Sequence, residues 1–379
     1  MSGPARPGRG GEAIGQMPSF STKSAFRRDL MTAVGEHLAA EERYGRPSTG
    51  DPRLKRKAAV ILAWFAMSFG ALLFAPTLPL ALLAAISLAL AASALGFGVF
   101  HDANHGTLFR HRGGNLWMAR LCSVVLGPSR HFWVYKHQGL HHRQPNVFGW
   151  DDDLETRGLL RLTPASPWHP RYRHQEVKAL LFYGLNTLEW LFWKDFLCLA
   201  RGQLNEWHVI ALSKGERAEL LICKALYISL FVLPPLLMLP LAWSIAAFFV
   251  FHFALSWLLA IVFQLAHLTP GMQFEGVRAG DDWSVHQLRT TADFATSSRL
   301  ATWFTGGLNH QIEHHLFPNV AHSHYPALRP IVRTVAERHG IQCYELGGIF
   351  AAVRQHFVLL KALGSPSWSS QSEPGTATA

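Results

Sequence analysis

The chain has 379 residues, of which 49% are hydrophobic and only 16% charged, and its formal net charge is +10. This composition is more apolar and less charged than that of an average soluble domain. The positive charge suits contact with anionic lipid headgroups, and the sequence contains no RNA-binding or zinc-finger pattern, so we expect no nucleic-acid partner.

The two ends of the chain are expected to be disordered. Residues 1–22 are rich in Gly, Pro and Arg and contain no apolar stretch that would mark a cleaved signal peptide. The tail at 365–379 is similarly polar. Residues 23–364 form the expected membrane domain, which begins with a short amphipathic helix from Ser24 to Glu42. The four scattered cysteines lack a C-x-x-C pattern and are expected to be reduced.

Two long segments, 58–100 and 225–266, contain no Asp, Glu, Lys or Arg. As a helix rising 1.5 Å per residue, each would extend roughly 64 Å, about twice the thickness of a bilayer core. Prolines lie near the middle of both segments. The pattern predicts four transmembrane helices arranged as two hairpins, and the alternative is a very apolar core hairpin in a soluble protein.

The distribution of basic residues predicts how the chain is oriented in the membrane. Nine Lys and Arg residues between Lys23 and Lys57 precede the first apolar segment, whereas the hairpin turns carry none. The positive-inside rule then places both termini and the middle region in the cytoplasm. Within that region, Lys178–Ala200 mixes aromatic and charged residues, which is typical of a helix lying in the membrane interface.

Histidines gather just outside the apolar segments. Residues four apart share one face of a helix, which pairs His101 with His105, His137 with His141, and His310 with His314. The adjacent His142 and His315 let one helix offer nitrogens to two neighbouring points, and His267 follows the fourth span. These imidazoles exceed the three or four ligands of one zinc site, so we expect two metal ions. Imidazole suits Zn, Cu, Fe and Ni alike, so the residue types alone do not specify which metal binds.

Other histidines have simpler interpretations. His111, His131, His252 and His286 are expected to be ordinary residues of the membrane interface. A histidine-rich metal transporter is the alternative function from a different class of protein. Such a transporter would carry polar ligands inside its spans, whereas here the clusters lie at the predicted cytoplasmic ends of the spans.

Three short motifs resemble the histidine boxes of the membrane fatty acid desaturases. They are HDANH at 101–105, HQGLHH at 137–142 and QIEHH at 311–315, and the glutamine that heads the third box resembles the front-end subgroup. The flanking phrases WDDDLE, DWSVHQLRTT and HSHYPALRPIV are also similar to that family. The resemblance extends over residues 52–364. It implies an all-α integral membrane fold whose cytoplasmic helical cap carries the boxes.

The resemblance also implies an activity, a cofactor and a set of ligands. Members of this family are non-haem di-iron enzymes that remove two hydrogens from a fatty acyl chain, using O2 and two electrons. Front-end members place the new double bond between an existing one and the carboxyl end. The iron ligands implied by the match are His101, His105, His137, His141, His142, His267, Gln311, His314 and His315. Asp102, His310 and Glu313 are expected to lie around them, and His310 competes with Gln311 for contact with metal.

The same resemblance predicts the partners. The substrate is expected to be an acyl-CoA or an acyl-lipid in a bacterial plasma membrane or the endoplasmic reticulum. The sequence lacks the His-Pro-Gly-Gly motif of a fused cytochrome b5 domain, so electrons are expected from a separate donor such as a ferredoxin or cytochrome b5. An acyl-lipid hydroxylase or a related di-iron oxygenase on the same scaffold remains the alternative within the family.

Overall fold

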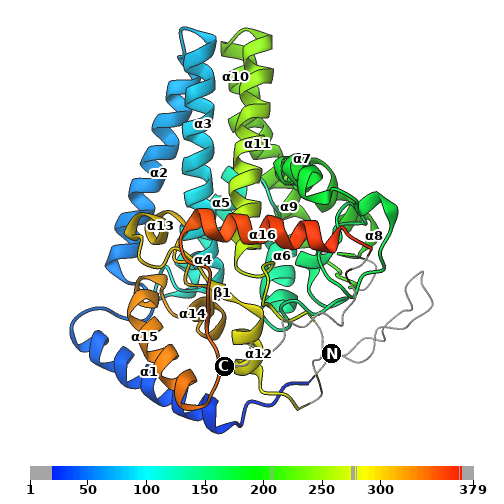
Figure 1. The fold of residues 1–379 in the computed structure, drawn as a ribbon. Helices are drawn as coiled ribbons and strands as arrows, with labels where there is room; N and C mark the ends of the chain where they lie inside the picture. Colours follow the sequence, from blue (N-terminus) through cyan, green and yellow to red (C-terminus); the bar gives the residue numbers. More distant parts are fainter. Residues whose placement is uncertain (1–18, 206–207, 275–277, 279, 367, 369–379) are drawn as a thin grey trace.

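The computed structural model describes residues 19–205, 208–274, 278, 280–366 and 368. Within these residues, four helical segments are long and apolar enough to cross a membrane, as the sequence predicted. They are Pro52–Leu73, Leu78–His105, Lys214–Met238 and Leu241–Leu265. Figure 1 shows them projecting in one direction from a broader body of shorter helices.

The first two spans extend beyond the uncharged segment at both ends. The first span is helix α2 (Pro52–Leu73), whose start is capped by Asp51 and whose first position is the proline. The second consists of α3 (Leu78–Leu95), the π-helix η1 (Gly96–Phe100) and α4 (His101–His105). It stops at Gly106, which adopts a left-handed conformation. The first histidine box is therefore the last turn of a span.

The third span begins about ten residues earlier than the apolar segment suggested. It consists of α9 (Lys214–Tyr227), the π-helix η6 (Ile228–Val232) and α10 (Leu233–Met238), and it starts at a capping box between Ser213 and Glu216. The turn to α11 (Leu241–Leu265) follows at Leu239 and Pro240. The charged first turns of α9 continue without a break into the apolar part of the span. The charge pattern therefore placed the start of this helix too late in the sequence.

The remaining elements form the body that carries the histidine boxes. Its helices in chain order are α1 (Ala25–Arg43), α5 (Arg112–Leu126), α6 (Arg130–Val134), η2 (Tyr135–His141), η3 (Asp152–Leu154), η4 (Pro170–Tyr172), α7 (Gln175–Glu189), η5 (Trp190–Lys194), α8 (Asp195–Arg201), α12 (Trp283–Thr290), α13 (Arg299–Phe304), α14 (Gln311–Leu316), η7 (His322–His324), α15 (Tyr325–Arg338) and α16 (Ile349–Leu363). The strands β1 (Ala292–Asp293) and β2 (Tyr344–Glu345) make one short parallel pair.

The expected amphipathic helix near the N-terminus is confirmed as α1. Ser24 caps its first turn by accepting a hydrogen bond from the Arg27 backbone N–H. Phe26, Leu30 and Val34 lie on one face of α1 and are buried in the hydrophobic cluster shared with α15. This packing holds an N-terminal helix against the segment that follows the third box (Figure 1).

The outer faces of the spans are apolar and exposed. Met67, Phe74 and Leu237 are 67%, 77% and 75% exposed although they are large hydrophobic side chains. An apolar surface of this kind belongs against lipid, because water would leave it unstable. Composition and structure together identify the chain as an integral membrane protein.

The prediction of terminal disorder falls mostly outside the described residues. Residues 1–18 and 369–379 belong to that part of the chain. Within the described part, Ser21 makes a β-bridge with Asp282, and its backbone N–H donates to the Asp281 carbonyl at 2.7 Å. Residues 19–22 are thus attached to the segment that leads into α12.

Candidate metal centre

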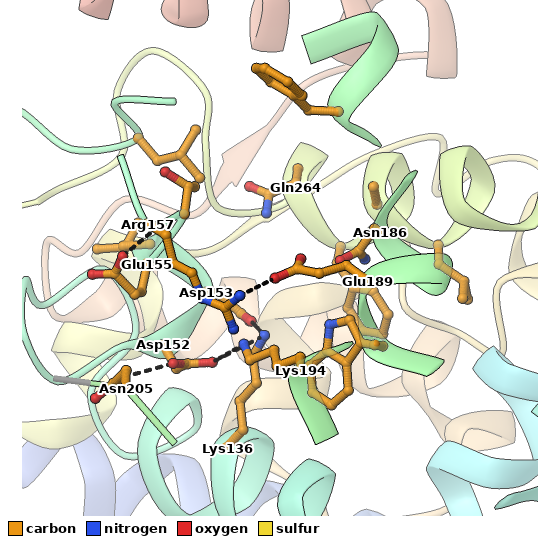
Figure 2. Close-up of a pocket in the computed structure, with 18 of the residues that line it drawn as sticks. Lys136, Asp152, Asp153, Glu155, Arg157, Asn186, Glu189, Lys194, Asn205 and Gln264 are labelled. Atoms are coloured by element: carbon orange, nitrogen blue, oxygen red, sulfur yellow. Dashed lines mark hydrogen bonds and ion pairs between the residues drawn. The ribbon is translucent and has the colours of Figure 1, made fainter. Parts of the chain in front are cut away.

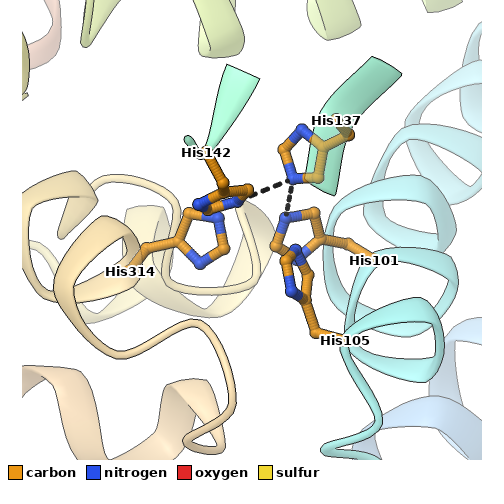
Figure 3. Close-up of side chains that lie close together, drawn as sticks. All are labelled: His101, His105, His137, His142 and His314. Atoms are coloured by element: carbon orange, nitrogen blue, oxygen red, sulfur yellow. Dashed lines mark hydrogen bonds between the residues drawn. The ribbon is translucent and has the colours of Figure 1, made fainter. Parts of the chain in front are cut away.

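Eight histidines from four separate parts of the chain converge where the second and fourth spans meet the body. One group joins His101, His105, His137, His142 and His314, and their ligand nitrogens all lie within 4.8 Å of one another (Figure 3). A second group joins His141, His267 and His315 within the same limit. These are the box histidines together with the histidine that follows the fourth span, so the structure brings the sequence-predicted set together.

The second box is wound as a π-helix, which corrects one expected pairing. The α-helical spacing paired His137 with His141. In η2 the His142 N–H instead donates to the His137 carbonyl at 2.9 Å, which is the hydrogen bond between residues five apart that defines a π-helix. The Nε2 atoms of His137 and His142 lie 3.1 Å apart in the first group, while His141 points to the second. One widened turn thereby supplies ligands to both groups.

The third box divides its ligands in a similar way. On the short helix α14, His314 belongs to the first group and the adjacent His315 to the second. Successive residues of a helix point about 100° apart, so neighbouring rings can serve neighbouring centres. Each His-His doublet thus places one ring in each of the two groups, and its service to two metal ions stays a prediction.

The spacing and burial of the nitrogens fit metal ions. Two ligands bound at right angles, each at roughly 2.1 Å from one ion, lie about 3 Å apart. The Nε2 atoms of His101 and His142 are each 3.1 Å from that of His137. The Nε2 atoms of His105, His314 and His315 are buried and have no hydrogen-bond partner, although buried polar atoms normally have one. One cation in each group would satisfy them, the first at His105 and His314 and the second at His315.

Burial also keeps these rings in the form that binds metal. Loss of hydration, reinforced by the neighbouring imidazoles, holds the pKa of His137, His142 and His314 well below the usual range. The pKa of His267 falls to about 3, chiefly through burial. Neutral imidazole with a free lone pair is the species that coordinates a metal, so the environment favours ligation at neutral pH.

The other ring nitrogen, Nδ1, is held by an outer partner in several cases. His267 Nδ1 donates to the Thr290 carbonyl at 3.0 Å, and His315 Nδ1 donates to Gln287 Oε1 at 2.8 Å. A proton fixed on Nδ1 leaves the Nε2 lone pair for the metal and sets the orientation of the ring. Helix α12, which precedes the third box, therefore positions two ligands of the second group.

Two further ligands have partners of a different kind. His314 Nδ1 lies 3.2 Å from the Tyr325 hydroxyl, and His141 Nδ1 lies 3.1 Å from a carboxylate oxygen of Asp151. Burial lowers the pKa of His141, but Asp151 and Asp153 more than offset this and raise it above the ordinary value. The sequence analysis did not identify these hydrogen-bond partners of the Nδ1 atoms. They lie within the sequence phrases that resemble the family, and they are Asp151, Gln287, Thr290 and Tyr325.

Gln311 lies at the second group. Its Nε2 atom is 3.0 Å from His267 Nε2, and its Oε1 atom is buried without a hydrogen-bond partner. His310 lies in a different group, with Asp293 and Glu313, and its Nε2 is 3.3 Å from the Thr302 hydroxyl. Of the two competing side chains, the glutamine is the one in contact with the cluster of box histidines.

The three side chains expected around the ligands make their contacts elsewhere. Asp102 Oδ2 is 2.7 Å from His322 Nδ1, and His322 Nε2 is 2.9 Å from the Lys57 ammonium nitrogen. Glu313 lies beside Asp293, and burial together with the Asp293 charge raises its pKa well above the usual value. A role for Asp102, His310 and Glu313 in orienting ligands stays a prediction.

Two histidines assigned to the membrane interface are instead buried. His252 is 1% exposed inside α11 and lies within 3.0 Å of both Tyr227 and Thr187. His286 is 5% exposed and contacts the Pro145 carbonyl. Hydropathy could not reveal this, because the partners that satisfy the two rings come from distant segments.

A cavity of about 720 Å³ adjoins the cluster at His137 and His267. Much of its wall is apolar, including Phe100, Leu255 and Phe263. The rest is charged, and Figure 2 shows that charged part. There Lys194 contacts Asp152 at 3.1 Å, Lys136 contacts Asp153 at 2.8 Å, and Arg157 contacts Glu189 at 2.9 Å. The cavity therefore has a charged part, lined by these ion pairs, and an apolar part.

Comparison with known proteins agrees with this arrangement. A family model described as fatty acid desaturase matches residues 76–347, a range that contains all three boxes. The sn-1 linoleoyl-lipid 6-desaturase of Synechocystis sp. is 31% identical over 355 residues, covering 92% of this chain and 98% of the relative.

Eukaryotic relatives are also similar. The Delta(5) fatty acid desaturase A of Dictyostelium discoideum is 29% identical over 361 residues, which cover 92% of this chain and 77% of that protein. The Acyl-lipid (8-3)-desaturase of Physcomitrium patens is 31% identical over 323 residues, which cover 83% and 67%. The family match spans most of the chain and includes the converging histidines. The chain belongs to the fatty acid desaturase family.

Proposed function

We propose that this desaturase acts on a polyunsaturated acyl chain and inserts the new double bond between an existing one and the carboxyl end. The observation that carries the proposal is the position of the charged end of the cavity. Lys136 directly precedes His137, and Asp153 lies 3.2 Å from His141 Nδ1. An acyl chain whose polar end occupies that region has the carbons near its carboxyl group beside the histidines. The relatives named for positions 6 and 5 support the same preference.

The acyl carrier is proposed to be a membrane glycerolipid. Lys136, Arg157 and Lys194 line the cavity and are each paired with a carboxylate, and the whole lining, with Arg171 and Arg201 included, holds five cations and five carboxylates. Coenzyme A carries several phosphate charges, and binding them calls for cations that are not already neutralised. A lipid headgroup that bonds mainly through hydroxyl and ester oxygens fits a balanced surface better. Two relatives have lipid-linked chains in their names, which supports this assignment.

The metal is proposed to be a pair of iron ions. The first would be held by the group of five histidines and the second by the group of three together with Gln311. Iron in these positions would supply the reduction of O2 and the removal of hydrogen from two adjacent methylene groups. The protein contributes neutral ligands, rings fixed through Nδ1 and an apolar wall that excludes water. The wall also restrains the chain, so its shape determines which carbons lie beside the histidines.

The remaining components follow from the reaction. Forming one double bond while O2 is reduced to water takes two electrons from outside, and a ferredoxin or cytochrome b5 is the proposed donor. The basic residues before the first span favour a cytoplasmic location for the histidines. The membrane would then be a bacterial plasma membrane or the endoplasmic reticulum. The membrane domain is proposed to run from 23 to 364.

The test is lipid analysis of a host that produces the protein and is fed defined polyunsaturated acids. The expected product lacks two hydrogens, carries its new double bond on the carboxyl side, and appears in glycerolipids before it appears in the acyl-CoA pool. A product that gains an oxygen would contradict desaturation. A new bond on the methyl side would contradict the front-end assignment, and first appearance in acyl-CoA would contradict the proposed carrier.

A further inference from the structure

A second cavity of about 210 Å³ lies among the spans, next to the first. Apart from Ser244 and Tyr227, its lining side chains are apolar. The two cavities share the same helices. On α11, Phe251 lines the second cavity and Leu255, one turn later, lines the first. On α5, Val125 lines the second and Leu126 the first.

A chain of three hydrogen-bonded side chains crosses from one cavity to the other. Tyr227, which lines the second cavity, places its hydroxyl 3.0 Å from His252 Nε2. The other nitrogen of that ring, Nδ1, is 3.0 Å from the hydroxyl of Thr187, which lines the first cavity. Ser256 adds a contact to the same threonine hydroxyl at 2.6 Å. The histidine therefore lies between the cavities with both ring nitrogens engaged.

These hydrogen-bonded polar side chains lie in surroundings that are otherwise largely apolar. His252 is in the middle of a membrane span and 1% exposed. Burying an ionisable side chain at that depth costs free energy, and such residues usually have a function. It is also far in sequence from every histidine box. Close packing adds rigidity beside it, since a Cβ atom on Gly127 would lie 2.7 Å from Leu191 and 3.6 Å from Tyr227. The wall is therefore held by hydrogen bonds and by steric contact.

We propose that Tyr227, His252 and Thr187 form a partition that sets the longest acyl chain the enzyme accepts. This inference rests on the proposed function, in which the carboxyl end of the substrate lies in the first cavity beside Lys136 and Lys194, next to His137. The methyl end then extends away from the histidines toward Thr187 and stops at the partition. The second cavity is the space that a longer chain would enter if the partition were removed.

The test is the product ratio from a series of polyunsaturated acids that differ in length by two carbons. Tyr227→Ala removes the side chain that faces the second cavity, and Leu230→Ala is the matched control. Leu230 is 48% exposed in the same span and does not line either cavity. In Tyr227→Ala we expect longer chains to gain about tenfold relative to the normal substrate, which is the discrimination that one methylene in a closed pocket gives. An unchanged ratio in an active Tyr227→Ala protein would overturn the proposal.

Two further variants separate a steric wall from a general loosening. Tyr227→Phe keeps the ring, so its ratio should move much less than that of Tyr227→Ala, and an equal shift would contradict the partition. Ala247→Leu, added to Tyr227→Ala, puts volume back into the second cavity that Ala247 lines and should reverse the gain. If Tyr227→Ala does not accumulate in membranes, Tyr227→Leu takes its place. A wild-type protein that forms no double bond in any chain would refute the proposed function, whereas the partition alone fails if the wild type is active and the ratios do not change.

Discussion

The Nδ1 atom of His315 lies 2.8 Å from the Oε1 atom of Gln287, and both side chains are buried. Gln287 belongs to α12 and His315 to α14, so this hydrogen bond joins two helices. It fixes the ring proton on Nδ1 and directs the Nε2 lone pair toward the second group of histidines. A residue outside both groups of histidines therefore helps to define the candidate metal centre.

Replacing Gln287 should weaken metal binding without removing a ligand. In Gln287→Ala the His315 ring loses its acceptor and can rotate, and loss of such a partner typically lowers metal affinity or activity by about 10- to 100-fold. Gln287→Glu retains an oxygen at this position and should recover most of the bound metal. The measurement is iron per chain in purified protein. Wild-type iron content in Gln287→Ala, under limiting iron, would show that the hydrogen bond has no such role.

His314 and His310 make a matched pair of substitutions. His314→Ala removes a nitrogen from the first group, so we expect no desaturated product although the protein still inserts into membranes. His310→Ala changes a ring in a different group, with Asp293 and Glu313, and should leave measurable product. Product analysis and membrane immunoblotting on the same cells give both quantities. Full activity in His314→Ala would refute the ligand assignment.

Gln311 can be tested by a substitution that gains a stronger ligand. Its amide lies 3.0 Å from His267 Nε2, close enough for an imidazole at the same position to reach the second group. We expect Gln311→His to retain activity and Gln311→Leu, which offers no donor atom, to lose at least about 10-fold. Desaturation rates normalised to membrane protein decide the matter. Equal activity in wild type and Gln311→Leu would mean that the amide has no part in the site.

Asp293 predicts a pH-dependent stability. Burial raises its pKa from 3.8 to about 7, even though the Ile312 N–H and Arg329 favour the charged form. A raised folded-state pKa contributes stability that is fully present below the unfolded pKa of 3.8 and is lost as pH rises through about 7. Asp293→Asn can still accept the Ile312 hydrogen bond but does not titrate.

The comparison of these two proteins isolates that group. Across this pH window, the unfolding temperature of the wild type should fall relative to that of Asp293→Asn, because the wild type must ionise a buried carboxyl. Thermal unfolding of both proteins in the same detergent and buffers provides the measurement. A difference between them that stays constant with pH would count against the raised pKa.

The spans and the histidine boxes could be predicted because their signals are local. A run without charges over 58–100 has few alternatives to crossing a membrane, and HDANH on one helical face is visible in the sequence itself. The boundaries were less certain. Lys214 is the first residue of the third span, about ten residues before the uncharged segment, because a capping box at Ser213 starts the helix there and hydropathy does not register such a cap.

The arrangement within the site depended on features that the sequence does not display. An α-helical period pairs His137 with His141, but the π-turn of η2 pairs His137 with His142 instead. The hydrogen-bond partners of the Nδ1 atoms include the Thr290 carbonyl and the Gln287 side chain. These are common polar groups, and they contact the ligand histidines only because α12 packs against the cluster. The buried histidine His252 was mistaken for an interfacial residue because Tyr227 and Thr187 are distant in the chain.

The most direct test of a two-iron centre is the metal content of active protein. Iron per chain and product mass should be measured on one sample of the full chain in lipid nanodiscs, supplied with an electron donor and O2. Two groups of ligands that each hold one ion predict two iron ions per chain, and desaturation predicts a product that lacks two hydrogens. Active protein that holds one iron ion or none would contradict a centre built from two groups of histidines.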